Sequence, residues 1–157
     1  SVTQEHIVST IVRGQLGQIY LPNLGSQKDR VALATPDGNM HELSIIIADI
    51  LCRVNRVSTS YLGASHPPEC LAEAVNALNC KTVVMGVLSS DRWDFNKNMI
   101  PYLKQMDSFL NHKVKVILGG AAPLALPKFE HIQEVEFMAS FIDFDQALGN
   151  YTLSLDP

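Results

Sequence analysis

One histidine of this 157-residue chain stands where it could bind a metal ion or a ligand. His41 follows Pro36-Asp37-Gly38, a turn sequence that separates an apolar run from a long apolar-periodic segment. A turn between a strand and a helix lies at the edge where open α/β sheets bind their ligands. A neutral imidazole can bind a metal through one ring nitrogen while a neighbouring group orients the other. The sequence therefore indicates His41 as a candidate ligand.

A pair of glycines, Gly119-Gly120, ends another apolar run later in the chain. Because glycine lacks a Cβ atom, the backbone can approach a ligand closely at these positions. Small residues also follow the other apolar runs, as in Gly63-Ala64-Ser65. This pattern favours a flat or elongated ligand that lies between the strand ends.

Three other kinds of site lack the residues they need. A phosphate-accepting receiver domain requires clustered acidic residues at the first and third strand ends, and only Asp37 is near. The Gly-x-Gly-x-x-Gly pattern of dinucleotide-binding sites is absent, as is the Gly-x-Ser-x-Gly pattern of hydrolases. The sequence therefore argues against these three functions.

The composition restricts the class of protein further. The length fits one domain, and a hydrophobic content of 46% is enough for a buried core. A net charge of −4 argues against a chain that grips nucleic acid by itself. The sequence has neither a secretion signal nor an apolar run of about 18 residues, the length that a membrane-spanning helix needs. Cys52, Cys70 and Cys80 indicate buried or partly buried thiols in a reducing compartment. We therefore expect a cytoplasmic protein without a membrane contact.

The remaining sequence predicts the elements that position these residues. Helical spacing of apolar residues predicts an N-terminal helix within 1–24. From residue 28 to residue 157, strands alternate with helices, which indicates an α/β domain with a doubly wound parallel sheet of five strands. We expect the flavodoxin-like (Rossmann-like) strand order 2-1-3-4-5. The expected strands are 31–34, 57–62, 82–87, 114–118 and 135–138. The expected helices are 41–54, 67–78, one that follows capping residues 89–91, and 143–153. A short helix or turn is expected at 124–132.

His41 and the paired glycines together resemble the cobalamin-binding domain family, whose pattern is Asp-x-His-x-x-Gly followed later by Gly-Gly. Asn39 stands at the Asp position of this pattern and Ser44 at the Gly position. The resemblance covers about residues 28–150, and it includes Leu51-Cys52-Arg53, Tyr61-Leu62-Gly63 and Pro68-Glu69. It implies cobalamin as the cofactor, most readily adenosylcobalamin, with His41 as the lower cobalt ligand in place of the cofactor's own base.

The same resemblance implies roles for further residues. Asn39 would orient His41, and Gly119 and Gly120 would line the cleft for the cofactor's dimethylbenzimidazole tail. Ser89 or Ser90 would stand in for the family's Ser-x-Leu motif at the third strand end. The residues that we expect to contact the cofactor are Glu5, His6, Asn39, His41, Ser44, Ser89, Ser90, Gly119 and Gly120.

Within the family, the chain is most similar to the sensory domains of CarH- and LitR-like regulators of the MerR type. Glu5-His6 looks like the pair by which their helix bundle touches the upper face of the corrin. Residues 1–24 would then be the remnant of a helix-bundle cap. The resemblance implies a non-enzymatic sensor in which cofactor state or light changes homo-oligomerisation, and which meets DNA only through a domain absent from this chain.

Three alternatives stay open. The domain could carry methyl groups as the corrinoid module of a methyltransferase. It could instead be a degenerate interaction or dimerisation domain without a cofactor, because Asn39 and Ser44 depart from the motif. A haem or another tetrapyrrole in the same cleft is a smaller possibility.

Overall fold

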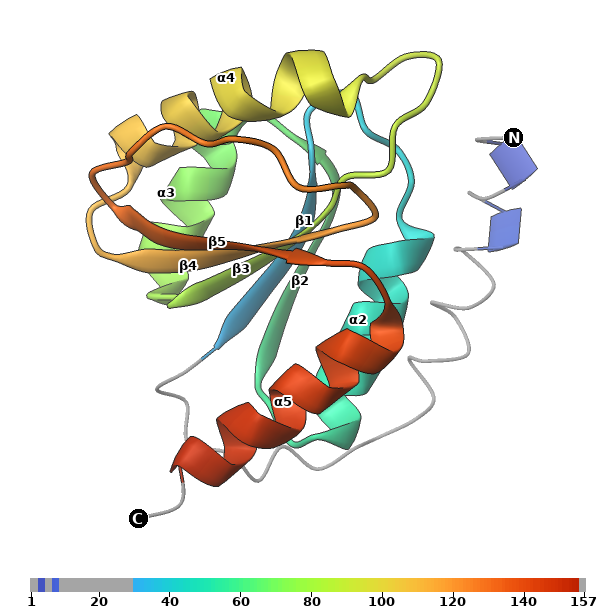
Figure 1. Ribbon diagram of the computed structural model, residues 1–157, viewed down its shortest axis with the longest axis vertical. Helices are drawn as coiled ribbons and strands as arrows, with labels where there is room; N and C mark the ends of the chain where they lie inside the picture. Colours follow the sequence, from blue (N-terminus) through green and yellow to red (C-terminus); the bar gives the residue numbers. More distant parts are fainter. Residues whose placement is uncertain (1–2, 5–6, 9–29, 156–157) are drawn as a thin grey trace.

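A computed structural model of the chain describes residues 3–4, 7–8 and 30–155, with side chains up to residue 150. Five parallel strands form one sheet in the order β2-β1-β3-β4-β5, as Figure 1 shows. This confirms the predicted fold class and strand order. The elements are β1 (Val31–Pro36), α2 (Leu43–Val54), β2 (Thr59–His66), α3 (Pro68–Leu78), β3 (Thr82–Gly86), α4 (Phe95–Phe109), β4 (Val114–Gly119), β5 (Ile132–Met138) and α5 (Phe141–Leu155).

The predicted N-terminal helix lies outside the described residues, apart from residues 3–4 and 7–8, which are helical. Glu5 and His6 are therefore not placed. Among the described residues, no helix is long and apolar enough to cross a membrane.

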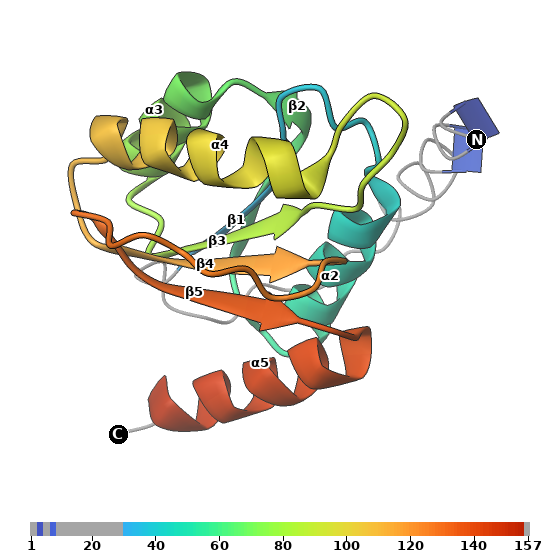
Figure 2. The same ribbon diagram turned by 45° about the horizontal axis from the view of Figure 1, so that its top comes forward.

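Helices α3 and α4 cover one face of the sheet, and α2 and α5 cover the other (Figure 2). On the α3–α4 side, alternate residues of the strands, among them Val83, Met85 and Val116, pack against fully buried helix residues such as Leu71 and Leu103. On the α2–α5 side, Leu33 and Val84 belong to a second apolar cluster with residues of α2 and α5. β1, β3 and β4 contribute to both clusters because successive side chains of a strand point to opposite faces.

The link between β4 and β5 differs from the prediction. Residues 120–131 contain no helix, and β5 begins at Ile132 instead of residue 135. Pro123 and Pro127 explain this, because each removes a backbone donor and favours an extended residue before it. Leu124 and Leu126 are both half-buried against the α3–α4 side, an alternation typical of an extended segment.

The start of α4 also differs from the prediction. The capping residue is Asp94, whose carboxylate accepts a hydrogen bond from the backbone N–H of Lys97 at 3.2 Å. Ser89 contributes from further away, since its Oγ accepts from the N–H of Phe95 at 3.0 Å. Trp93 is buried in the core.

The cysteines fit their predicted environment only in part. Cys52 and Cys80 are buried, whereas Cys70 in the first turn of α3 is exposed. Burial and the nearby Asp49 raise the pKa of the Cys52 thiol to about 12, which keeps it protonated. Cys70 was mispredicted because it precedes the fully buried Leu71 and therefore points away from the sheet.

Candidate functional site

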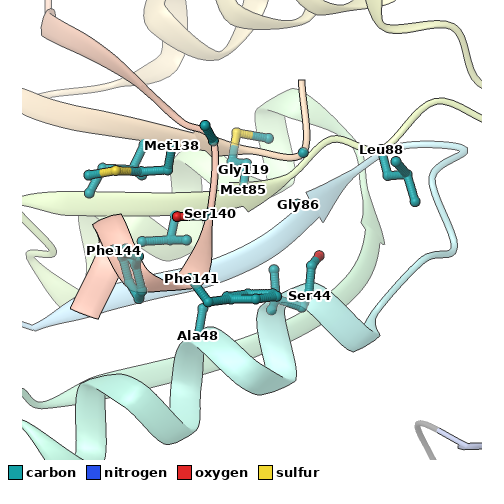
Figure 3. A pocket seen from close by; sticks show the side chains of 15 residues that line it. Ser44, Ala48, Met85, Gly86, Leu88, Gly119, Met138, Ser140, Phe141 and Phe144 are labelled. Carbon is teal, nitrogen blue, oxygen red and sulfur yellow. The ribbon is translucent and has the colours of Figure 1, made fainter. Parts of the chain in front are cut away.

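A cavity of about 230 Å³ opens at the carboxyl ends of the central strands, between the sheet and helices α2 and α5 (Figure 3). This is the edge at which open α/β sheets bind ligands. Its lining comes from the first turns of both helices and from the ends of β3, β4 and β5. The lining residues are Ser44, Ile45, Ala48, Val84, Met85, Gly86, Leu88, Ile117, Gly119, Gly120, Met138, Ala139, Ser140, Phe141 and Phe144.

The floor of the cavity depends on residues without side chains. A Cβ atom at Gly86 would lie 2.4 Å from Ser44 Oγ and 3.2 Å from Ile45 Cγ2, so a larger residue would close this part of the cavity. Gly120 has a φ of +97°, which favours glycine, and it lies against the backbone of Leu88. Gly119 and Gly120 therefore line the space, as the sequence predicted for a ligand cleft.

The mouth of the cavity has an apolar rim. Leu88 is 50% exposed, Phe141 is 43% exposed, and the neighbouring Ile142 is 72% exposed. Figure 3 shows the Phe141 ring reaching from the start of α5 toward α2. Exposed apolar side chains beside a concave apolar space are typical of a binding site for a ligand or partner.

His41 lies between β1 and α2, just outside the cavity lining. Its backbone N–H donates to Asn39 Oδ1 at 3.1 Å. Its ring is half-buried, and the Nε2 atom is buried and forms no hydrogen bond with the described residues. The predicted helix start at residue 41 is therefore too early, since α2 begins at Leu43.

Asn39 is fully buried and joins two loops. Its side-chain amide donates to the backbone carbonyl of Leu88 at 3.0 Å, while its Oδ1 atom accepts from the backbone of His41. Both of these bonds act on backbone groups. Asn39 therefore positions the His41 backbone relative to the end of β3. The prediction was that Asn39 would orient the imidazole ring of His41.

The end of β2 is also held to the loop after β1. Thr35 Oγ1 donates to the carbonyl of Asn39 and accepts from the N–H of Ser65 at 2.8 Å. The N–H of Gly38 donates to Ser65 Oγ at 3.1 Å. The end of β2 and the loops after β1 and β3 thus share one hydrogen-bond network that holds residue 41 in place.

Glu42 is a positioning residue that the sequence analysis missed. Its buried carboxylate accepts from the N–H of Ala64 at 3.2 Å and from the Tyr61 hydroxyl at 3.2 Å. These bonds span a register irregularity between β1 and β2 next to Gly63. A lone acidic residue before a helix gives no sequence signal for such a long-range contact.

The third strand end also differs from the prediction. Ser89 and Ser90 are not among the cavity-lining residues: Ser89 helps to start α4, and Ser90 pairs with Trp93. Gly86 and Leu88 line the cavity instead, and their spacing fits the Ser-x-Leu motif with Gly86 at the serine position. The apolar run of β3 ends at Gly86, and this was the sequence signal that could have placed the motif at Gly86 and Leu88.

The chemistry of the site is that of one histidine beside an apolar cleft. Among the described residues, no three His, Cys, Asp or Glu side chains lie close enough to hold a bare metal ion. A metal already held by an organic macrocycle needs only one protein ligand, and a single histidine suffices for that.

No protein-family model and no curated protein sequence matches this chain. A solved structure does: the methanol:cobalamin methyltransferase complex MtaBC from Methanosarcina barkeri aligns with a TM-score of 0.61 at 18% sequence identity. The alignment covers 92% of this chain and 62% of that one, so this chain spans less than two thirds of its neighbour. The likeness supports the α/β fold with alternating strands and helices.

Proposed function

We propose that this chain is a corrinoid-binding module in which His41 is the lower ligand of cobalt. The observation that carries the proposal is the glycine-floored cavity between α2 and α5, whose lining residue Ser44 follows His41 by three residues at the start of α2. A corrin outside the strand ends would meet the apolar rim, and the flat base of its tail would enter the cavity. The structural neighbour is a cobalamin methyltransferase complex, which supports the same class of ligand.

The residues present fit this group. Bound cobalamin would supply a cobalt–carbon bond whose making or breaking depends on the ligands above and below the metal. His41 would supply the ligand below, and the network around Asn39 would hold the residue in place. Asn39 bonds the backbone of His41 and carries no charge, so it does not raise the basicity of the imidazole as a carboxylate bonded to the ring would. We therefore expect a weaker cobalt–histidine bond than such a carboxylate partner would give.

A visible absorption titration with adenosylcobalamin in the dark tests the proposal. We expect the wild-type protein to bind with a spectrum that shows histidine in place of the cofactor's base. His41→Ala would lose that spectrum and bind at least about tenfold more weakly. His112→Ala is the matched control, because His112 precedes β4 and so lies at the opposite edge of the sheet. A folded wild-type protein that binds no corrinoid would overturn the proposal.

For the bound module we propose a sensory function without catalysis. The support is the resemblance of Glu5-His6 and the N-terminal segment to light- and cobalamin-responsive regulators. Illumination of the adenosylcobalamin complex would then change its oligomeric state, as measured by light scattering after size exclusion. An oligomeric state that is the same in the dark, in the light and without cofactor would contradict this function.

Methyl transfer is the second candidate, and the structural neighbour favours it. The module would carry a methyl group on cobalt between two partner enzymes, with His41 adjusting the reactivity of the metal. Retention of methylcobalamin in the dark, together with demethylation by a corrinoid methyltransferase, would distinguish the carrier from the sensor. If no corrinoid binds, the cofactor-free interaction domain is the function that fits this fold, with the apolar rim as its contact surface.

A further inference from the structure

The cavity contains few polar side chains, and their hydrogen bonds differ. Of its lining residues, only Ser44 and Ser140 carry a polar side chain. Ser140 Oγ is engaged, because it accepts from the N–H of Asp143 at 3.2 Å and so helps to start α5. The Ser44 hydroxyl forms no hydrogen bond with another described residue. Ser44 is therefore the side chain that could donate to a ligand inside the cavity.

Ser44 and Gly86 face each other across the floor of the cavity (Figure 3). Ser44 comes from the first turn of α2, and Gly86 ends β3. Because a Cβ atom at residue 86 would lie 2.4 Å from Ser44 Oγ, both positions cannot carry a hydroxymethyl group in these conformations. Gly86 does not have a positive φ, so contact with residue 44 is the constraint on this glycine and not its own backbone.

We infer that Ser44 determines which lower base the module accepts, by donating a hydrogen bond to a ring nitrogen of the base that enters the cavity. This inference rests on the proposed corrinoid function. The rest of the lining is apolar, so a ring nitrogen without a donor would lose its hydrogen bonds to water and gain none. The hydroxyl comes from the helix because the residue opposite, on the strand, is glycine. A corrinoid whose base offers a nitrogen acceptor is therefore preferred over one without a base.

The test compares cobalamin with cobinamide, a corrinoid that lacks the nucleotide tail. We expect Ser44→Ala to weaken cobalamin binding about tenfold, the effect of one lost hydrogen bond in an apolar site, and to leave cobinamide binding unchanged. Ser108→Ala is the matched control, since it removes a hydroxyl from an exposed position of α4, away from the cavity. This control should leave both affinities and their ratio unchanged. Equal binding of cobalamin by wild type and Ser44→Ala would overturn the inference and leave the proposed function standing.

An exchange of the two residues makes the test sharper. Gly86→Ser places two side chains in the space of one, and we expect a lower Tm and no cobalamin binding. The double variant Ser44→Ala/Gly86→Ser removes the atom at 2.4 Å and returns the hydroxyl from the strand side. It should regain the Tm and the preference for cobalamin over cobinamide.

The outcomes separate the two proposals. A double variant that stays as defective as Gly86→Ser would contradict the pairing of these residues. A wild-type protein that binds neither corrinoid would overturn the proposed function, and the inference with it.

Discussion

At the central strands, the α3–α4 side of the sheet is filled by apolar side chains, whereas the α2–α5 side keeps a cavity at the carboxyl ends of these strands. On the filled side, Leu71, Met99 and Leu103 are fully buried between the helices and the strands. On the other side, small residues such as Ala48 and Gly86 stand where α2 passes the strand ends. Helices α3 and α4 cover one side, and α2 and α5 cover the other. At the carboxyl ends of the central strands, the volume of a few side chains therefore decides which side keeps a cavity.

The two sides also differ in how they use charge. Asp107 of α4 lies on the filled side, where its carboxylate accepts from the backbone N–H groups of Glu130, His131 and Ile132 at 2.8–2.9 Å. These bonds fix the end of the extended link 120–131, which stands where a short helix or turn was predicted. On the α2–α5 side, Lys115 of β4 pairs with Glu136 of β5 at 2.6 Å while partly exposed to solvent. The Asp107 carboxylate is thus satisfied by backbone groups, whereas the Lys115–Glu136 pair is shared with water.

Loss of the Asp107 carboxylate should give the largest effect. We expect Asp107→Ala to lower the free energy of unfolding by about 3 kcal/mol, because three backbone N–H groups lose their acceptor. Urea unfolding followed by circular dichroism measures this. Asp107→Asn keeps one acceptor oxygen and should lose about half as much. If the free energy of unfolding of Asp107→Ala stayed within about 0.5 kcal/mol of wild type, the range of an ordinary surface substitution, contacts other than those of Asp107 would hold the link 120–131.

The same carboxylate predicts a dependence on pH. Burial raises the pKa of Asp107, but the backbone hydrogen bonds and the nearby His131 outweigh burial and hold the pKa below its usual value. Because the pKa is lower in the folded state, the stabilisation is complete above the unfolded pKa of about 3.9 and is lost as the pH falls through the folded value. Asp107→Asn should remove this part of the acid dependence.

The replacement of one buried alanine by leucine on each side of the sheet tests the difference in packing directly. Ala72→Leu adds volume to the filled side and should cost about 2 kcal/mol of stability, because Ala72 is fully buried there. Ala48→Leu adds the same volume beside the cavity and should cost less than about 1 kcal/mol, while it abolishes corrinoid binding. Thermal unfolding and the absorption titration measure both effects. Equal losses of stability would mean that the cavity side is as tightly packed as the other.

The smallest effect is expected at the exposed ion pair. Glu136→Gln should lower the free energy of unfolding by less than about 1 kcal/mol, because water and salt screen a partly exposed pair. The difference from wild type should shrink further in 1 M NaCl. A larger loss that does not depend on salt would place this pair in a drier environment than its exposure indicates.

The sequence predicted the fold well because periodicity is a local property. Apolar runs such as 82–87 identified the central strands, and their alternation with helices predicted the strand order. The loops were harder, since their structure depends on contacts between distant residues. Asn39 bonds to Leu88, and Asp107 binds the backbone of residues 130–132; neither pairing has a sequence pattern.

The candidate site was predicted in outline and not in detail. His41, Gly119 and Gly120 lie at one edge of the sheet, because the carboxyl ends of parallel strands meet there. Ser89 and Ser90 were chosen for their hydroxyl groups, yet Gly86 and Leu88 occupy the cavity at that strand end. Phe141 was missed because a residue that starts a helix carries no sign of what it covers. Their contacts with a cofactor remain predictions.

The network through Thr35, Asn39 and Ser65 reduces the conformational entropy of the loops at the carboxyl edge. Loops that already share hydrogen bonds have few alternative conformations to lose when a molecule settles on them. Association at this edge would then be driven mainly by the removal of water from an apolar cleft, which is favourable. Such a site is expected to show a negative heat-capacity change on binding with little sign of coupled folding.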